Sequence, residues 1–389
     1  MDVVVDTGSI ELVLPSLPCD LTSSGLSSRA CSAASAPAAF LSNDSSTFTA
    51  SSLGVNIAYG TGSASCAVAH DVVSIGELSA ANVTFAACAE TSGLNVTGSP
   101  VSGILGVPSH NPASSLGTNL WEALGATSIG IFQNRNNQTG ALTIGGDEPS
   151  LYTGQINYND VVNATSSFWE LKLDAIHVGI QLLGLEELNP TVVIDSGTSV
   201  LALPVSTLDS MFSAVPGSQA IDTTAGQSYA VPCDMTLNIT FTFGNISYVI
   251  QPQDIVQQGP ITTGGLCQVN AISSDSISGI PPYILGAPFL QSVYTVYRFA
   301  PAAVGFATLS SQASDFSAKL TDALVPVNTS GTAQPAVSTA TAKASGQSLS
   351  RGDQRPATGG ANDQVHVSEW FGTPAAVFIA GLLFLSLAR

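Results

Sequence analysis

Hydrophobic residues in this chain fall in short runs rather than at helical spacing. Up to about residue 310, runs rich in Val, Ile, Thr and Phe are interrupted by Gly, Pro, Asn and Ser. Such runs are typical of β-strands joined by turns. Helical spacing is found mainly in residues 115–124 and 205–214. We therefore predict an all-β fold with two short helices.

Beyond residue 312 the pattern changes. Residues 313–358 become dominated by Ser, Thr, Ala, Gly and Pro. With so little to bury, they are predicted to form a disordered, O-glycosylated stalk. Small residues at 359–362, a polar spacer and an almost wholly apolar segment at 374–388 follow, which is the layout of a GPI-attachment signal. A tail anchor is the alternative, because Trp370 and Phe371 could lengthen the segment toward the roughly twenty residues of a membrane span.

Two short stretches of the chain repeat one pattern. Val4-Val5-Asp6-Thr7-Gly8-Ser9 and Val193-Ile194-Asp195-Ser196-Gly197-Thr198-Ser199 each run a β-branched strand into an acid, a hydroxyl residue and a glycine. One copy alone would be ordinary turn chemistry. Two copies, spaced by about one lobe of a two-lobed molecule, could bring two carboxylates close enough to share a proton. Such a pair is suited to general acid–base hydrolysis of an amide by water.

The composition argues against some classes of binding partner and indicates the cellular compartment. The chain has 9 Lys and Arg against 27 Asp and Glu, a net charge of −18, which argues against nucleic acid and a basic membrane-binding surface. The six cysteines form three neighbouring pairs without a C-x-x-C motif, and the four histidines are scattered, so we expect no metal site and no cofactor. Eight N-glycosylation sequons favour a secretory route, and they begin at Asn43, Asn82, Asn95, Asn137, Asn163, Asn238, Asn245 and Asn328.

The start of the chain does not fit a secretory protein by itself. Met1 is followed at once by an acid and a strand, without a leader. We therefore expect that further residues precede Met1 in the natural protein.

The ordered motifs resemble the pepsin-like aspartic endopeptidases, particularly the GPI-anchored fungal, yapsin-type members. The resemblance runs from the first strand to about residue 309. Besides the two acid turns, these segments carry it: Tyr59-Gly60-Thr61-Gly62-Ser63 as the flap hairpin, Gly103-Ile104-Leu105-Gly106 and Ile284-Leu285-Gly286 as strands beside the acid turns, residues 142–157 as the crossing between lobes, Phe168-Trp169-Glu170-Leu171 as the opening of the second lobe, and residues 294–306 as the closing strands.

The resemblance implies a bilobal fold, with two β lobes of the six-stranded type and a central cleft. The N-terminal lobe would comprise residues 1–155, and the C-terminal lobe residues 156–312. The stalk at 313–358 and the attachment signal or anchor at 359–389 would follow. Because the family carries further strands before the first acid, the resemblance also implies that the first strands of the N-terminal lobe are missing here.

The resemblance also assigns roles to site residues. Asp6 and Asp195 would be the catalytic pair, supported by Thr7, Gly8, Ser9, Ser196, Gly197 and Thr198. Thr7 and Ser196 would tie the two turns together, while Ser9 and Thr198 would bond the outer carboxylate oxygens. Flap and substrate-binding positions would be Tyr59, Gly60, Thr61, Val4, Val101 and Ile104.

Three disulfides are expected. The resemblance places one at Cys233–Cys267. Cys66 lies on the return strand of the flap and Cys88 on a strand that could run beside it, so we hypothesise a Cys66–Cys88 bridge. A Cys19–Cys31 bridge would close the loop after the first acid turn.

The expected function is that of a monomeric aspartic endopeptidase at the cell surface or outside the cell. It would cleave polypeptides at acid pH through a water activated by the two aspartates. A non-catalytic relative that only binds peptides is the main alternative, since Val13 stands where the family usually carries Trp and the first strands are missing. A structural wall glycoprotein would fit the stalk, the sequons and the anchor, but it would not require the paired acid turns.

Overall fold

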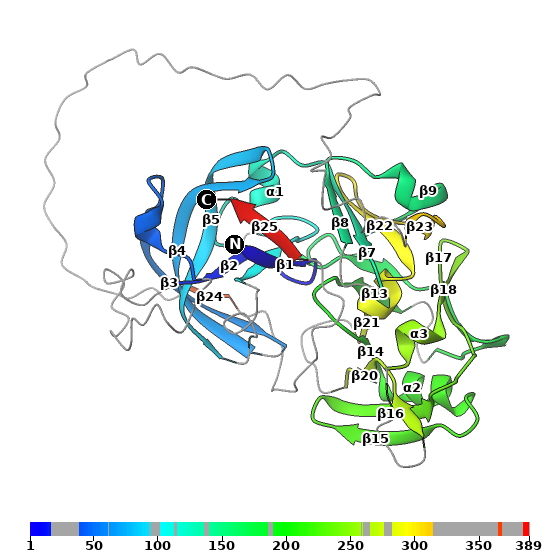
Figure 1. Cartoon of the computed structure of the whole chain (residues 1–389). Coiled ribbons are helices and arrows are strands. Elements are labelled where there is room, and N and C mark those ends of the chain that lie inside the picture. Colours follow the sequence, from blue (N-terminus) through cyan, green and yellow to red (C-terminus); the bar gives the residue numbers. More distant parts are fainter. Residues whose placement is uncertain are drawn as a thin grey trace, which may run out of the picture.

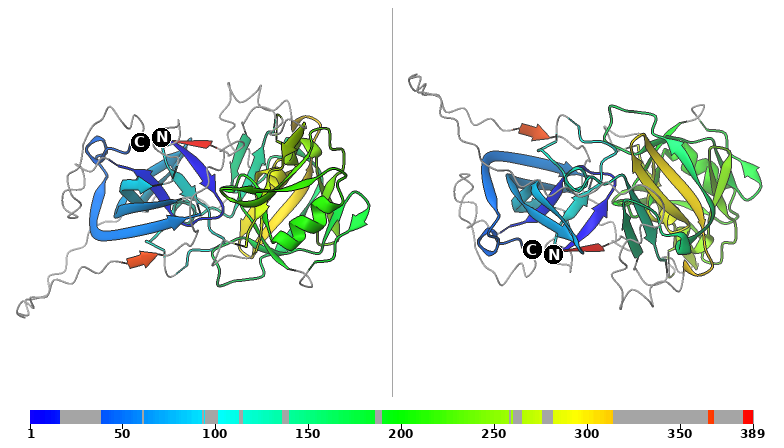
Figure 2. Two further views of the ribbon diagram at one scale, coloured as in Figure 1. Left: turned by 90° about the horizontal axis from the view of Figure 1, so that it is seen from below. Right: turned by 90° about the horizontal axis from the view of Figure 1, so that it is seen from above.

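The computed structural model describes residues 1–16, 39–60, 62–92, 94, 102–112, 115–135, 140–185, 190–257, 259, 265–275 and 282–313, and the backbone of 365–367 and 384–388. Its strands form several sheets arranged in two bodies, one blue and cyan, the other mainly green and yellow (Figure 1). Both views in Figure 2 keep these bodies on opposite sides. The predicted all-β fold with two lobes is confirmed.

The first lobe is built on one eight-stranded sheet in the order β24-β3-β4-β25-β1-β6-β2-β5. Strand β5 also pairs with β4, so the sheet curls back on itself. Its strands are β1 (Asp2–Asp6), β2 (Leu12–Pro15), β3 (Thr49–Tyr59), β4 (Gly62–Ile75), β5 (Leu78–Ser92), β6 (Ile104–Gly106), β24 (Val365–Val367) and β25 (Phe384–Ala388).

Strand β25 connects the far end of the chain to the strand that carries Asp6. It pairs antiparallel with β1, opposite Asp2, Val3 and Val4, and with the end of β4. Figure 1 shows it as the red arrow beside the blue β1. The sheet position next to β1 is therefore filled by residues 384–386, close to the end of the 389-residue chain.

The second lobe contains three sheets, in the orders β10-β13-β21-β14-β20, β12-β11-β17-β18 and β15-β16-β19. Their strands are β10 (Glu170–Lys172), β11 (Ala175–Val178), β12 (Gln181–Leu182), β13 (Thr191–Ile194), β14 (Leu201–Leu203), β15 (Gln219–Thr223), β16 (Gly226–Pro232), β17 (Ile239–Phe243), β18 (Ile246–Ile250), β19 (Leu266–Gln268), β20 (Ala271–Ser273) and β21 (Tyr283–Leu285).

A further sheet joins the two halves, and we call it the interlobe sheet. Its order is β8-β7-β22-β23-β9, so strands that precede β10 in the chain pair with strands that follow β21. Its members are β7 (Ser128–Gln133), β8 (Gly140–Ile144), β9 (Tyr152–Asp160), β22 (Val293–Phe299) and β23 (Ala302–Leu309). The helices are short, namely α1 (Leu120–Ala123), α2 (Val205–Ser213), α3 (Pro252–Ile255) and α4 (Ala287–Leu290).

The helix predicted at residues 115–124 is reduced to the single turn α1, while α2 agrees with the prediction at 205–214. Gly117 has a φ of +155°, outside the helical region. Helix α1 begins after Asn119, whose side chain accepts the Glu122 amide hydrogen and caps the first turn. The first half of the predicted helix is therefore a loop, and its Leu116 amide donates to the Glu11 carboxylate.

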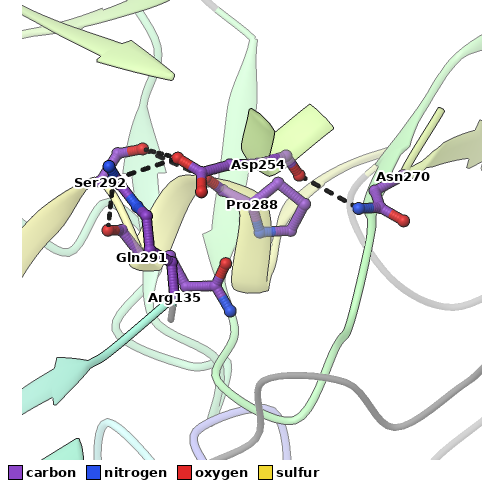
Figure 3. Close-up of polar contacts among 6 residues, drawn as sticks. All are labelled: Arg135, Asp254, Asn270, Pro288, Gln291 and Ser292. Carbon is purple, nitrogen blue, oxygen red and sulfur yellow. Dashed lines mark hydrogen bonds and ion pairs between the residues drawn. The ribbon is translucent and has the colours of Figure 1, made fainter. Parts of the chain in front are cut away.

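An ion pair connects the interlobe sheet to the second lobe (Figure 3). Arg135, just after β7, lies 3.1 Å from the buried Asp254 carboxylate of α3. Arg135 also donates to the carbonyl of Gln291 at 2.9 Å, and the Ser292 hydroxyl donates to Asp254 at 3.0 Å. Asn270 donates to the Asp254 carbonyl. The buried carboxylate is thus compensated by one charge and one hydroxyl.

Candidate active site

The two acid turns have the same backbone setting. Strand β1 runs parallel to β6, and β13 runs parallel to β21. Gly106 at the end of β6 and Gly286 just after β21 each pack against the neighbouring acid turn. A Cβ on Gly106 would overlap the backbone of Ile10, and one on Gly286 would overlap the Thr198 carbonyl. Only glycine permits this close approach, which explains the hydrophobic-hydrophobic-Gly motifs.

Asp6 and Asp195 face each other across the two turns. Their residues are only 9% and 5% exposed. Each carboxylate accepts a bond from its own turn, from Gly8 N at 2.9 Å and from Gly197 N at 2.7 Å. A Cβ on Gly8 would lie 2.6 Å from Asp195 Oδ2, and one on Gly197 would overlap Asp6 Oδ1. Each carboxylate therefore lies against the opposite turn.

Thr7 and Ser196 bind the two turns reciprocally. The Thr7 amide donates to Ser196 Oγ at 3.1 Å, and the Ser196 amide donates to Thr7 Oγ1 at 2.9 Å. Each hydroxyl then donates to a carbonyl of the opposite strand, Thr7 to Ile194 and Ser196 to Val5. Both side chains are fully buried. These four bonds hold the carboxylates in register, because a loss of any one would leave a buried polar group unpaired.

The residues Ser9 and Thr198 differ in their contacts. Thr198 Oγ1 donates to Asp195 Oδ2 at 2.5 Å, as the resemblance implies. The Ser9 hydroxyl is buried beside Asp6 and lowers the pKa of that carboxyl. However, its Oγ meets the geometry of a hydrogen bond with none of the residues that the structure describes. Of the two carboxylates, Asp195 therefore has the better defined hydrogen bond from a hydroxyl group.

Burial and neighbouring groups shift the pKa of each carboxyl group. The pKa of Asp6 is raised by burial first and by the charge of Asp195 second. Burial also raises the pKa of Asp195, but the bonds from Thr198 and Gly197 oppose it by stabilising the ionised form. The two groups titrate as a coupled pair. Because the pKa of both carboxyls is raised, a pair in which both are ionised is disfavoured.

Tyr59 and Gly60 of the predicted flap lie at the end of a β-hairpin. Strands β3 and β4 form a hairpin, and Tyr59 at the end of β3 is 7% exposed. It belongs to a hydrophobic cluster with Val4, Ile104 and Val13. Gly60 lies in the hairpin turn, whereas the predicted positions Thr61 and Val101 lie outside the described residues.

Two of the three expected disulfides are present. Cys66 and Cys88 join β4 to β5, and Cys233 and Cys267 are joined in the second lobe. Both members of the Cys19–Cys31 pair lie outside the described residues.

Three residues near the acid turns were assigned no site role in the sequence analysis. Glu11 is 3% exposed, and burial raises its pKa to about 7 although Leu116 N donates to it. Tyr297 of β22 lies beneath Thr7, with its hydroxyl 3.5 Å from Thr7 Oγ1. Trp169 donates to the Val107 carbonyl at 2.7 Å. The closing strands were recognised by their pattern, but no local signal marks Tyr297 as a neighbour of the first acid turn.

The described part of the chain contains no group of three or more His, Cys, Asp or Glu that could hold a metal ion. No helix within it has the length and hydrophobicity required to cross a bilayer.

Comparison with known proteins gives a consistent result. The family model for eukaryotic aspartyl proteases matches residues 1–309. Major aspartyl peptidase 1 of Cryptococcus neoformans is 29% identical over 293 residues, which are 69% of this chain and 60% of that protein. Pepsin A of Sus scrofa is 29% identical over 319 residues, 79% of this chain and 77% of that protein. A probable aspartic-type endopeptidase of Arthroderma otae is 30% identical over 260 residues, 65% of this chain and 66% of that protein.

Proposed function

Because the chain belongs to the eukaryotic aspartyl protease family, we propose that it is an endopeptidase that cleaves polypeptides at acid pH with Asp6 and Asp195. The observation that carries this proposal is the reciprocal bonding of Thr7 and Ser196, which holds two buried carboxylates against each other's turns. A pair so placed can keep one proton and one charge, as acid–base hydrolysis requires.

In the proposed reaction, Asp195 is the ionised partner and Asp6 the protonated one. The Asp195 carboxylate accepts a proton from a water molecule as the water oxygen attacks the scissile carbonyl carbon. Asp6 donates its proton to the carbonyl oxygen, so the tetrahedral product carries no net charge. Asp195 then gives its new proton to the leaving nitrogen, the C–N bond breaks, and a hydroxyl of the tetrahedral product returns a proton to Asp6, so hydrolysis is complete and the pair is restored. The amides of Gly8 and Gly197 stabilise whichever carboxyl is charged.

The flap side of the pair would bind the peptide chain. Tyr59, Val4 and Ile104 offer buried apolar surface next to the first acid turn. This surface favours bulky apolar substrate side chains, because it presents no carboxylate to attract a basic one.

We also propose a secretory route that ends at the cell surface or outside the cell. Two disulfides and exposed sequon asparagines support it, since Asn82, Asn238 and Asn245 all lie on the surface. Lipid attachment at residues 359–362 would remove β24 and β25 from the first sheet. It would thereby expose the edge of β1 that β25 now covers.

The test is cleavage of a denatured protein substrate at about pH 4, with and without pepstatin. Wild type should cleave, pepstatin should block cleavage, and Asp195→Asn should abolish it. Asp222→Asn, at an exposed position on β15, is the matched control and should retain activity. Equal rates for wild type and Asp195→Asn would exclude the proposal.

A peptide-binding relative without catalysis is the second candidate. It is favoured by Val13, an aliphatic residue in the cluster that holds Tyr59, because valine cannot donate a hydrogen bond to the flap. Tight binding of pepstatin, together with failure to cleave any member of a peptide library, would support this candidate over the endopeptidase.

A further inference from the structure

A buried tyrosine lies directly behind the first acid turn. Tyr297 belongs to β22 of the interlobe sheet, is fully buried and places its hydroxyl 3.5 Å from Thr7 Oγ1. Among the described residues, Thr7 is the hydrogen-bond partner found for this hydroxyl. A buried hydroxyl needs such a partner, since leaving it unpaired costs about 1–3 kcal/mol.

The Thr7 hydroxyl connects three groups. Its oxygen lies 3.0 Å from the Ile194 carbonyl and 3.5 Å from the Tyr297 hydroxyl, and its single hydrogen is shared between these two acceptors. The same oxygen accepts the Ser196 amide hydrogen. Thr7 therefore links the opposite acid turn and the interlobe sheet through one side chain.

The other half of the site lacks this third bond. The Ser196 hydroxyl accepts from the Thr7 amide and donates to the Val5 carbonyl, and the described residues supply it with no third partner. Thus only the turn that carries Asp6 is attached to the interlobe sheet through a hydroxyl.

Packing keeps the tyrosine in place. Its ring contacts Trp169 edge to face, with centroids 5.0 Å apart. Trp169 donates to the Val107 carbonyl, and the Val107 amide donates to the Asp6 carbonyl at 2.8 Å. Tyr297 therefore contacts the Asp6 turn directly at Thr7, and its ring also packs on Trp169, which is connected to the same turn through Val107.

We propose that Tyr297 is a positioning residue for the acid pair, accepting from Thr7 and so holding Asp6 at the distance from Asp195 that proton sharing requires. This inference rests on the proposed function. Burial first, and the charges of Asp195 and Asp6 next, raise the pKa of the Tyr297 phenol. The phenol consequently stays neutral at any pH at which the enzyme would work.

The test compares Tyr297→Phe with Tyr294→Phe in the full chain. The first change removes only the hydroxyl and keeps the ring on Trp169. Tyr294 is a buried tyrosine of the same strand. Its hydroxyl accepts from Glu148 N, and none of its hydrogen bonds within the described residues is to Thr7. It therefore controls for loss of a buried hydroxyl.

Tyr297→Phe should lower kcat about five- to tenfold, with KM within about twofold of wild type, because one hydrogen bond of the supporting network is lost. The pH profile of kcat/KM should also move, since the spacing of the pair sets its coupled titration. Tyr294→Phe should lower only the melting temperature. A wild-type kcat and pH profile in Tyr297→Phe would overturn the inference.

Failure of the proposed function would give a different result. If wild type neither cleaves protein nor binds pepstatin by calorimetry, the endopeptidase proposal fails. The positioning role is then decided by melting temperatures between about pH 4 and pH 8. Tyr297→Phe should shift the midpoint of that dependence and Tyr294→Phe should not; identical midpoints in wild type and Tyr297→Phe would reject the inference.

Discussion

Replacing Glu11 with glutamine tests whether one buried carboxyl makes the first lobe more stable in acid than at neutral pH. Glu11 is 3% exposed, and its Oε1 accepts the Leu116 amide hydrogen at 2.9 Å. Burial raises its pKa from 4.5 to about 7, against the opposing effect of that bond. Glutamine keeps an oxygen acceptor for Leu116 and cannot ionise, so the change removes the titration and little else.

The direction of the effect follows from proton binding. Below pH 4.5, Glu11 is protonated in both the folded and the unfolded chain. As pH rises to about 7, the unfolded chain releases this proton while the folded chain keeps it, so stability falls. The difference between 4.5 and about 7, at about 1.36 kcal/mol per pKa unit, corresponds to about 3 kcal/mol. That stability is present in acid and lost above about pH 7.

Calorimetric melting at about pH 4 and pH 8 measures this loss. At roughly 2–4 °C per kcal/mol, Glu11 should account for about 6–12 °C of the fall in melting temperature of the first lobe. The acid pair contributes in the same direction, so the assignment rests on the difference between wild type and Glu11→Gln. Glu77→Gln, in the exposed β4–β5 turn, is the control. If Glu11→Gln loses as many degrees as wild type between the two pH values, the reasoning is refuted.

Two further substitutions test the structure at separate places. Arg135→Met should destabilise the chain to urea by about 3 kcal/mol at pH 7, because the buried Asp254 carboxylate would lose its counter-charge. Burial raises the pKa of Asp254 against the effect of Arg135, so the cost should shrink at pH 4; a cost independent of pH would contradict this account. Gly197→Ala should lower activity about 100-fold or more without unfolding, because its Cβ would overlap Asp6 Oδ1. Gly184→Ala, where a Cβ meets open space, is the control, and equal activities would show that the two acids do not lie as described.

Much of the fold and part of the site could be predicted from local sequence patterns. Strand-length hydrophobic runs and turn residues determine where strands begin and end, so the all-β fold and α2 could be predicted. The acid turns were recognisable because Asp6 and Asp195 share one local motif. The helix predicted at residues 115–124 is shorter in the structure, because Gly117 has a non-helical φ of +155° and Asn119 caps the helix just before Leu120.

The sequence by itself determined which residue types end the two acid strands and how the chain alternates between strand and turn. Only the tertiary structure decided that the hydroxyls of Thr7 and Ser196 bond across 189 positions, and that Tyr297 meets Thr7 across 290. It also decided that β25 fills the sheet beside β1. Periodicity records which face of an element is buried. It does not record which partner a buried donor or acceptor will find, because that depends on how distant strands pair.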